Sequence, residues 1–375
     1  MKQESLRVII SGGGTGGHIF PAISIANAIK QLRPDAAILF VGATGRMEMQ
    51  RVPQAGYEIK GLPIRGLYRP LWKPANIGVA IDYLRSKWQA RKLIRDFQPQ
   101  VAVGVGGYAS SATLGAAYDM GIPCLVQEQN SFAGLTNKQL AHKARLFCVA
   151  YEGMERFFPK EKILLTGNPV RQQLLEATVT REEALKSFGL DTKKKTVLIV
   201  GGSLGARTLN ESVLSHLDDI ERQQDEVQFV WQTGKFYSAQ IAEQLKQTPA
   251  PKNLVVTDFI ADMAAAYRAA DLVVSRAGAG SISEFCLLGM PVILVPSPNV
   301  AEDHQTKNAM ALVDRDAALY LKDAEAKDHL VALALKTVTD SQRLDELHTN
   351  ILKLALPNSA EMIAKEAIKL AHQTQ

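Results

Sequence analysis

The chain has 375 residues, more than a single hydrophobic core usually organises, and its 46% hydrophobic and 22% charged residues are typical of a soluble globular protein with two domains. No apolar run approaches the ~18 residues that span a bilayer, and the first residues, MKQESLRVIIS, contain no secretory apolar stretch, so we expect neither a membrane helix nor a signal peptide. Cys124, Cys148 and Cys286 form no CxxC pair, which argues against a disulfide framework or a metal site and favours buried thiols in a reducing cytoplasm.

Short β-branched runs alternate with longer helical patterns, as in parallel sheets built from βαβ units. The predicted strands are residues 7–11, 38–41, 101–103, 124–127 and 146–150 in the first half, and 197–200, 229–232, 254–257, 272–275 and 292–296 in the second. Each half opens with a strand, a glycine-rich loop and a helix, first RVIISGGGTGGH and then TVLIVGGSLGAR. The sequence therefore predicts two doubly wound α/β domains facing each other across a cleft, with a boundary near 167–171 and a final helix at 359–372.

The first glycine-rich loop, GGGTGGH, satisfies the G-x-G-x-x-G pattern through Gly12, Gly14 and Gly17. A dinucleotide site also needs an acidic residue about 20 residues further on, but the next strand ends in FVGAT, and no GK[ST] follows the loop as in a P-loop. We therefore expect no nicotinamide or flavin cofactor. Glycines and a helix start still favour an anionic or oxygen-rich ligand, because the backbone can approach it closely and offers N–H groups.

His18 lies in the first turn of the helix that follows this loop. The positive end of the helix dipole disfavours an imidazolium, so the ring should stay neutral and able to accept a proton. A catalytic or substrate-contacting role is one interpretation, and a histidine that only caps the loop is the other.

Basic residues are concentrated in the first half of the chain. Residues 1–171 hold 22 Lys and Arg against 11 Asp and Glu, whereas residues 172–375 hold 21 against 27. Nine of the basic residues lie between Lys60 and Arg95, where Asp82 is the one acid. We therefore expect an anionic partner for the first domain, but not nucleic acid, because no nucleic-acid-binding module surrounds this stretch.

The second half contains two further loops that precede helices. GGSLGAR places Ser203 and backbone amides where they would contact a diphosphate, or else forms a tight turn beside a solvated Arg207. In SRAGAGSISEFCLLG the predicted helix begins at Ser281, and the amides of residues 279–281 would face phosphates. Glu284 has two interpretations that the spacing leaves open: the acid of a capping box with Ser281, or an acceptor for the two hydroxyls of a ribose.

Together these strings closely resemble the MurG family of bacterial N-acetylglucosaminyltransferases. The matching segments follow the family order over residues 12–309. They are GGGTGGHIFPA (12–22), GVGGYASS (104–111), EQNSFAGLTN (128–137), TGNPVR (166–171), GGSLGAR (201–207), FIADMAAAYRAADLVVSRAGAGSISE (259–284) and AEDHQTKNA (301–309).

The resemblance implies the GT-B fold, in which two Rossmann-like domains bind substrates in the cleft between them. Residues 1–170 would form the acceptor and membrane side, residues 171–356 would bind UDP-N-acetylglucosamine, and the helix in 357–375 would pack back on the first domain. The implied reaction needs no cofactor. It transfers N-acetylglucosamine, with inversion at the anomeric carbon, to the 4-hydroxyl of the muramoyl pentapeptide of undecaprenyl-diphosphate-linked lipid I. The products are lipid II and UDP. Such an enzyme would work in peptidoglycan synthesis as a peripheral protein on the cytoplasmic face of the bacterial inner membrane, beside other cell-wall enzymes.

The same resemblance implies a set of substrate contacts. Those to the donor phosphates are Arg171, Ser203 and the helix start Ala279, Gly280, Ser281, Ile282 and Ser283. The others are Thr15, Gly16 and Gly17 for the donor or acceptor region, Asn130 and Gln305 for the sugar, Ile260 for uracil through its backbone, and Glu284 for the ribose. Alternatively, Arg171 is an interdomain hinge contact and Gln305 a solvated polar residue.

The general base has two candidates, His18 first and Glu128 second, with Tyr108 as a group that positions the acceptor. The family loop typically reads HEQN, whereas this chain has Gln127-Glu128-Gln129-Asn130, so a histidine is replaced and Glu128 is kept. No DxD pair stands at a strand end to hold a metal. We expect helix dipoles, backbone amides and Arg171 to stabilise the leaving UDP.

A lipid acceptor also accounts for the basic stretch. Leu71, Trp72, Ile81, Leu84 and Trp88 lie among its charges, and an apolar patch rimmed by Lys and Arg would dock on an anionic membrane surface, at about 1 kcal/mol for each nearby basic side chain. The alternative is an ordinary amphipathic helix that packs its apolar residues into its own domain.

Three rival functions are open. A GT-B transferase with another lipid acceptor, such as diacylglycerol, would have much the same donor half, and a UDP-N-acetylglucosamine epimerase shares the fold but needs no acceptor. A non-catalytic scaffold that binds UDP-N-acetylglucosamine is disfavoured, because His18, Glu128 and Glu284 are all present.

Overall fold

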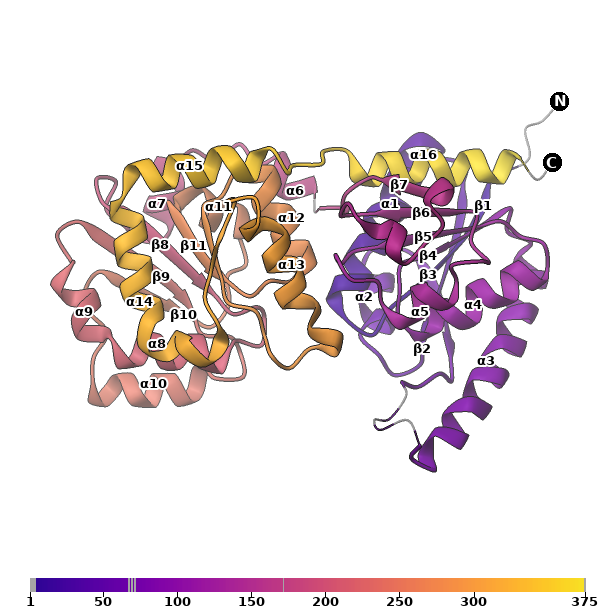
Figure 1. Ribbon diagram of the computed structural model, residues 1–375, viewed down its shortest axis with the longest axis horizontal. Coiled ribbons are helices and arrows are strands. Elements are labelled where there is room, and N and C mark those ends of the chain that lie inside the picture. Colours follow the sequence, from indigo (N-terminus) through magenta and orange to yellow (C-terminus); the bar gives the residue numbers. More distant parts are fainter. Residues whose placement is uncertain (1–4, 67, 69, 71, 171, 374–375) are drawn as a thin grey trace. The chain divides into compact units, whose positions relative to one another are not determined.

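The computed structural model describes residues 5–66, 68, 70, 72–170 and 172–373, and the chain divides into two units. The first unit joins the residues up to Arg171 to those from Leu356 onward, and the second holds Gln172–Ala355. Figure 1 shows each unit as a sheet with helices packed against it, and every predicted strand is present. Among the described residues, no helix is long and apolar enough to cross a membrane.

The first unit contains seven parallel strands in the order β3-β2-β1-β4-β5-β6-β7. They are β1 (Arg7–Ser11), β2 (Ala37–Ala43), β3 (Glu58–Leu62), β4 (Val101–Gly104), β5 (Cys124–Glu128), β6 (Leu146–Val149) and β7 (Ile163–Leu165). The chain winds outward from β1 through β2 and β3, then returns to the other side of β1 with β4. The strand order therefore reverses between β1 and β4.

Helices cover both faces of this sheet. They are α1 (Gly16–Leu32), α2 (Glu48–Gln54), α3 (Ala75–Phe97), α4 (Tyr108–Asp119), α5 (Leu135–Gln139) and α16 (Ser359–His372). On one face, Ile25 of α1 and Ile363 of α16 share a buried apolar core. On the other, Ile94 of α3 and Leu114 of α4 join a second core. The last helix of the chain therefore belongs to the first unit, as Figure 1 shows.

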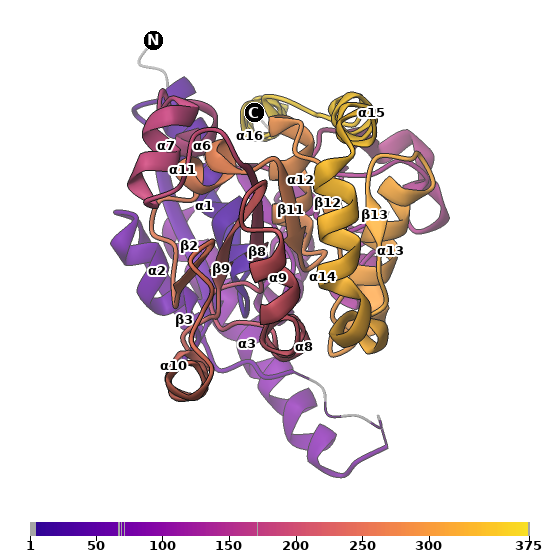
Figure 2. The same ribbon diagram turned by 90° about the vertical axis from the view of Figure 1, so that its left-hand side faces the viewer.

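The second unit contains six parallel strands in the order β10-β9-β8-β11-β12-β13. Figure 2 labels β8, β9, β11, β12 and β13 of this sheet. They are β8 (Lys195–Val200), β9 (Val227–Gln232), β10 (Leu254–Thr257), β11 (Leu272–Ser275), β12 (Val292–Leu294) and β13 (Leu319–Tyr320). The order again reverses between the first strand of the unit, β8, and the fourth, β11. The predicted doubly wound α/β architecture is thus confirmed in both units.

The helices of the second unit pack around a core that includes the fully buried side chains of Phe229 and Trp231. They are α6 (Gln172–Leu175), α7 (Arg181–Ser187), α8 (Arg207–Ser215), α9 (Leu217–Arg222), α10 (Ser238–Gln247), α11 (Met263–Ala269), α12 (Ala279–Leu288), α13 (His304–Val313), α14 (Asp323–Thr339) and α15 (Ser341–Leu352). Helix α12 begins two residues before the predicted start at Ser281. All three cysteines are buried and unpaired, as predicted.

Candidate active site

In the first unit, the predicted site residues gather at the carboxyl edge of the sheet where the strand order reverses. Strands β1 and β4 are neighbours, with Ser11 opposite Gly104. Each runs into a glycine-containing loop and then a helix, α1 or α4. In open parallel sheets, ligands bind at this reversal point.

The two loops touch through their backbones. A Cβ atom placed on Gly107 would lie 2.6 Å from the carbonyl oxygen of Gly13, and Gly107 has a φ of +85°. Only glycine allows both the contact and this dihedral angle without strain. The starts of α1 and α4 are therefore held side by side, and the N–H groups of both first turns lie at the same edge of the sheet.

His18 points its ring into this junction. Its Nδ1 atom lies 3.0 Å from the carbonyl oxygen of Gly13 and 3.4 Å from Oγ1 of Thr15. Because a carbonyl oxygen only accepts, the hydrogen bond to Gly13 requires the proton on Nδ1. In the neutral ring Nε2 is then the proton acceptor. A Cβ atom on Gly106 would lie 2.9 Å from Nε2, so this position also needs glycine.

Thr15, Gly16 and Gly17 form the N-terminus of α1. Thr15 is the N-cap residue in an extended conformation, and its side chain makes no capping hydrogen bond. The N–H groups of Gly16 and Gly17 have no intrahelical acceptor, as in any first helical turn. These three residues thus present donors and a hydroxyl beside His18.

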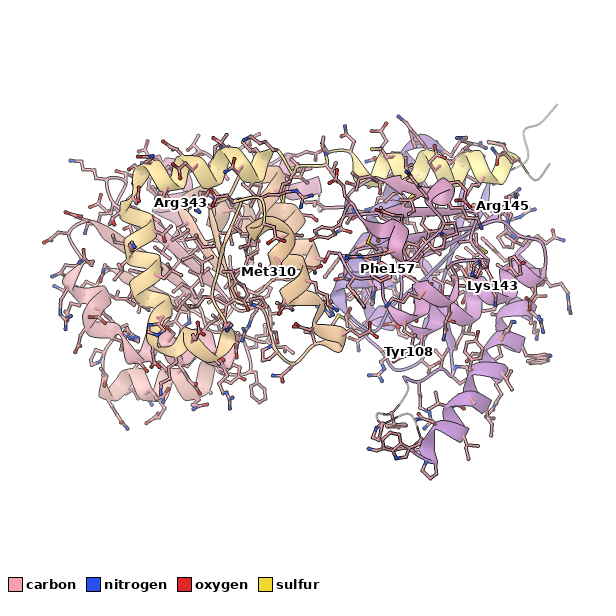
Figure 3. The ribbon with its side chains drawn as sticks, in the orientation of Figure 1. Tyr108, Lys143, Arg145, Phe157, Met310 and Arg343 are labelled. Carbon is pink, nitrogen blue, oxygen red and sulfur yellow. The ribbon has the colours of Figure 1, made fainter. Side chains whose placement is uncertain are left out.

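Tyr108 is the first residue of α4 (Figure 3). Its ring packs over Gly66, where a Cβ atom would lie 2.7 Å from Cε2, and 44% of the residue is exposed. The phenol follows the Gly106–Gly107 turn and lies on the same edge as His18.

The geometry of Glu128 does not suit a general base. The residue is 1% exposed, and its Oε1 accepts hydrogen bonds from the N–H and the side-chain amide of Asn130 at 3.0 and 3.2 Å. Its Oε2 accepts from the N–H of Gly134 at 3.0 Å and from the amide of Asn137 at 2.8 Å. Because the carboxylate oxygens already face four donors, we assign Glu128 the role of shaping the loop that carries Asn130.

Gln127, which replaces the histidine of the family motif, is part of a buried amide network. Its Nε2 donates to Oδ1 of Asn168 at 2.9 Å, and Nδ2 of Asn168 donates to the carbonyl oxygen of Gln129 at 3.0 Å. Gln129 in turn donates to the carbonyl oxygen of Val105 at 2.8 Å. The network joins the end of β5 to the loop after β4 and to the segment before the unit boundary.

In the second unit, the predicted site residues again follow the strands where the order reverses. Ser203 is exposed in the loop between β8 and α8, and its carbonyl oxygen accepts a hydrogen bond from the N–H of Lys235 at 3.2 Å. Strand β11, the neighbour of β8, leads into the start of α12. A diphosphate between Ser203 and this helix start would meet N–H groups and a positive helix dipole.

The start of α12 settles the two interpretations of Glu284 in part. The N-cap residue is Gly278, without a side-chain cap, and Ser281 is already inside the helix, so the capping-box interpretation is wrong. Glu284 is 7% exposed, and its Oε2 accepts a hydrogen bond from the hydroxyl of Tyr267 at 3.0 Å. A buried, oriented carboxylate thus lies just over one turn along α12 from its first N–H groups, those of Ala279 and Gly280.

The remaining predicted residues lie on neighbouring loops of the second unit. Ile260 is buried between β10 and α11, and only its backbone would serve a ligand. Gln305, at the start of α13, accepts a hydrogen bond from the N–H of Ser297 through Oε1 at 2.8 Å. Glu302 and Asp303 before it have φ angles of +56° and +52°, and such strain in non-glycine residues clusters at functional sites. Arg171 lies outside the described residues.

Glu48 is a site residue that the sequence did not predict. It is 1% exposed, and its carboxylate lies under the first glycine-rich loop, where Oε2 accepts a hydrogen bond from the N–H of Gly14 at 2.9 Å. The sequence offers no pattern for it, because an acid at the start of a short helix is usually solvated.

Two family descriptions match the chain. The glycosyltransferase family 28 N-terminal domain matches residues 8–148, and the C-terminal domain of that family matches residues 196–369. The UDP-N-acetylglucosamine--N-acetylmuramyl-(pentapeptide) pyrophosphoryl-undecaprenol N-acetylglucosamine transferase of Bacteroides fragilis is 66% identical over 372 residues, which cover 99% of this chain and 97% of the relative. The transferase of the same name from Bacteroides thetaiotaomicron is 64% identical, over 98% of this chain and 99% of the relative.

Solved structures of two kinds are similar to the chain. The crystal structure of MurG from Acinetobacter baumannii matches with a TM-score of 0.77 at 29% identity, over 97% of this chain and 99% of that one. A UDP-N-acetylglucosamine 2-epimerase from Neisseria meningitidis, bound to UDP-N-acetylglucosamine, matches with a TM-score of 0.69 at 14% identity, over 97% of this chain and 100% of that one. The second likeness is one of fold alone.

Proposed function

The chain belongs to glycosyltransferase family 28, and on that premise we propose that it transfers N-acetylglucosamine from UDP-N-acetylglucosamine to the 4-hydroxyl of the muramoyl unit of lipid I, giving lipid II and UDP. The observation that carries this proposal is the 66% identity, over 99% of the chain, to a transferase named for this donor and this acceptor. The site geometry supports roles for individual residues in such a transfer.

The second unit binds the donor in this proposal. The N–H groups at the start of α12, from Ala279 to Ser281, face the diphosphate together with Ser203, and Ile282 and Ser283 complete this first turn. Glu284 accepts the ribose hydroxyls. Gln305 contacts the sugar, and the backbone of Ile260 contacts the uracil. Arg171, the last residue of the first unit, is a further proposed contact to the diphosphate and lies outside the described residues. As the bond between the anomeric carbon and the UDP oxygen breaks, the helix dipole stabilises the charge on the leaving diphosphate.

The first unit activates the acceptor. Nε2 of His18 takes the proton of the muramoyl 4-hydroxyl while the oxygen attacks the anomeric carbon and UDP leaves with the bonding electrons. The attack is in line with the departing oxygen, so the configuration at the anomeric carbon is inverted. Tyr108 and the first turn of α1 position the acceptor, and Asn130, held by Glu128, contacts the transferred sugar.

A membrane surface is the site of the reaction, because the acceptor is a lipid. Helix α3 carries four apolar residues along one exposed side, 53–69% exposed, which we name the α3 stripe: Ile77, Ile81, Leu84 and Trp88. The opposite side, including Val79 and Ala90, is buried, so the alternative that the stripe packs into its own unit is wrong. Figure 1 shows the first half of α3 extending beyond the other helices of its unit.

Charge complementarity favours an anionic bilayer as the occupant of this surface. Lys73, Arg85 and Lys92 are exposed on or beside α3, and Trp72 before it is 84% exposed. Arg69 and Leu71, which the sequence grouped with them, lie outside the described residues. An apolar stripe flanked by basic side chains binds anionic lipid headgroups and inserts its apolar side at the interface. The enzyme would then be peripheral, on the cytoplasmic face of the inner membrane, where other cell-wall enzymes act.

An acceptor panel tests the proposed reaction. The purified chain is incubated with labelled UDP-N-acetylglucosamine and a short-chain lipid I analogue, with diacylglycerol, or without any acceptor, and the products are separated. We expect a labelled disaccharide lipid only with the lipid I analogue. Label on diacylglycerol would indicate a different lipid acceptor. Epimerised sugar in the absence of an acceptor would indicate an epimerase, and tight UDP binding without any product would indicate a scaffold.

A further inference from the structure

Glu48 is a buried acid for which the transfer mechanism has no direct use. It opens α2, and its two carboxylate oxygens accept separate backbone hydrogen bonds, Oε1 from Ala43 at 3.0 Å and Oε2 from Gly14 at 2.9 Å. Ala43 ends β2, and Gly14 lies in the loop after β1, so the side chain ties together two adjacent strand ends. A buried carboxylate is retained only where such partners satisfy it.

The carboxylate of Glu48 fits because two neighbouring residues, Gly42 and Gly13, have no side chain. A Cβ atom on Gly42 would lie 2.5 Å from Cγ of Glu48, and one on Gly13 would overlap the carboxylate itself. A side chain at either position would therefore displace Glu48. Two glycines from different strand ends thus enclose the same acid.

The hydrogen bond to Gly14 connects Glu48 to the catalytic imidazole. The N–H of Gly14 and the carbonyl of Gly13 belong to one peptide group, and in a planar trans peptide they point in opposite directions. Glu48 accepts from this N–H on one side, and on the other the carbonyl accepts from Nδ1 of His18 at 3.0 Å. A carboxylate, a peptide group and an imidazole therefore stand in series.

We propose that Glu48 is a positioning residue that acts on His18 through the Gly13–Gly14 peptide. The carboxylate polarises the peptide, which makes the Gly13 carbonyl a stronger acceptor, and that acceptor holds the proton on Nδ1 and leaves Nε2 as the base. The arrangement resembles the carboxylate that orients histidine in hydrolase triads, with one peptide group interposed. It rests on the proposed role of His18 as general base.

The elements around the ring carry other ionisable groups. Tyr108 begins α4, directly after the Gly106–Gly107 turn. Lys30 of α1 is in the last turn, at the far end of the helix that starts beside His18. Helix α16 packs on α1 through apolar residues, and its Glu361 and Lys365 form an ion pair with each other at 2.7 Å. Glu48 is the acid that the Gly13–Gly14 peptide joins to the imidazole.

The test is a Glu48→Gln variant, in which one accepting oxygen replaces two and the charge is lost. The titration midpoint of His18 is measured by NMR in the free protein, with His18→Gln identifying the signal. We expect the midpoint to move to lower pH by about half a unit or more, because a nearby negative charge stabilises the imidazolium. The acid limb of kcat/KM should move the same way, with turnover several-fold lower and UDP affinity unchanged.

Asp340→Asn is the matched control, because Asp340 also accepts a backbone N–H, that of Arg343 at 3.0 Å, but in the second unit. It should leave the His18 midpoint unchanged. A folded Glu48→Gln protein with the wild-type midpoint would overturn the proposal, whatever the role of His18. A shifted midpoint together with full activity of His18→Gln would instead remove the base assignment and leave the link between Glu48 and His18 standing.

A second measurement needs no variant, in case Glu48→Gln does not fold. Long-range ¹H–¹⁵N spectra of the wild-type protein report which ring nitrogen of His18 carries the proton. The proposal requires Nδ1–H in the neutral ring. A neutral ring protonated on Nε2 contradicts it.

Discussion

Replacing Glu284 by Gln tests the donor site sharply, because the change keeps the shape of the side chain and removes its charge. Glu284 is 7% exposed, and its carboxylate is oriented by the hydroxyl of Tyr267 at 3.0 Å. Tyr267 itself is 5% exposed and packs edge-on against Phe285, with ring centroids 5.7 Å apart. The carboxylate is therefore fixed before any ligand arrives.

The expected magnitude follows from the hydrogen bonds that a ribose would make. A hydrogen bond to a charged group contributes about 1.5–3 kcal/mol, so Glu284→Gln should weaken UDP binding roughly tenfold to 150-fold. Tyr267→Phe removes only the neutral donor that orients the carboxylate, at about 0.5–1.5 kcal/mol, so it should weaken binding roughly twofold to tenfold.

Calorimetric titration with UDP and with 2′-deoxy-UDP provides the assay. The wild-type chain should prefer UDP, and Glu284→Gln should lose most of that preference as well as affinity, while its melting temperature stays near that of the wild type. If the variant binds UDP as tightly as the wild type, or keeps the full preference for the ribose hydroxyl, the assignment of Glu284 to the ribose is wrong.

Three further predictions concern the membrane surface, the glycine loops and the thiols. Replacing Leu84 and Trp88 of the α3 stripe by Ser should weaken binding to anionic liposomes, measured by sedimentation, at least tenfold. High salt should weaken the binding of the wild-type chain as well, and unchanged binding at high salt would contradict the proposed attraction between basic side chains and anionic lipids. If His18 is the general base, Gly106→Ala should lower turnover more than UDP affinity, since its Cβ atom would lie 2.9 Å from Nε2 of His18 at a φ of +96°. Turnover equal to that of the wild type would contradict that packing. Burial raises the pKa of Cys124 and of Cys286 to about 12, so native protein should react slowly with a thiol reagent at pH 8 and rapidly once unfolded. Fast reaction of the native thiols would contradict their burial. Because the pKa values of the two buried thiols lie above those of unfolded thiols, the stability that the neutral thiols contribute is present below about pH 8.5 and is lost as the pH rises toward 12.

The buried strands were the predictable part of the fold. Strands such as β1, β8 and β11 each contain a continuous run of buried apolar residues, because a parallel sheet covered on both faces excludes polar residues from its centre. Each is followed by glycines or a helix start, which marks its end. Their bounds were predicted to within a few residues.

The strands that the sequence did not reveal lie at sheet edges. β3 (Glu58–Leu62) alternates exposed and half-buried residues before the buried Leu62, β7 (Ile163–Leu165) is only half buried, and β13 (Leu319–Tyr320) has two residues. An edge strand needs neither a continuous apolar run nor much length, since one side has no neighbour. Local sequence patterns therefore carry little signal for it.

The candidate site was predictable where backbone chemistry decides it, and not where a side chain folds under a loop. The glycine-rich loops and helix starts can be read from spacing, because glycine and helix geometry determine them. Glu128 and Glu48 are both acids in the sequence, and only the structure shows that the first is saturated by four donors and that the second supports the His18 loop. The donors to Glu128 lie two to nine residues further along the chain, and Gly14 lies 34 residues from Glu48. Neither arrangement follows the period of a helix or a strand, so no sequence pattern identifies it.

The most direct test of the central claim compares the wild-type chain with His18→Ala in the transfer of labelled N-acetylglucosamine from UDP-N-acetylglucosamine to a short-chain lipid I analogue. The account predicts transfer by the wild type, and turnover lower by ~100-fold or more in the variant with UDP affinity unchanged, as expected when a general base is removed. No transfer by the wild type, or near-normal turnover by His18→Ala, would contradict it.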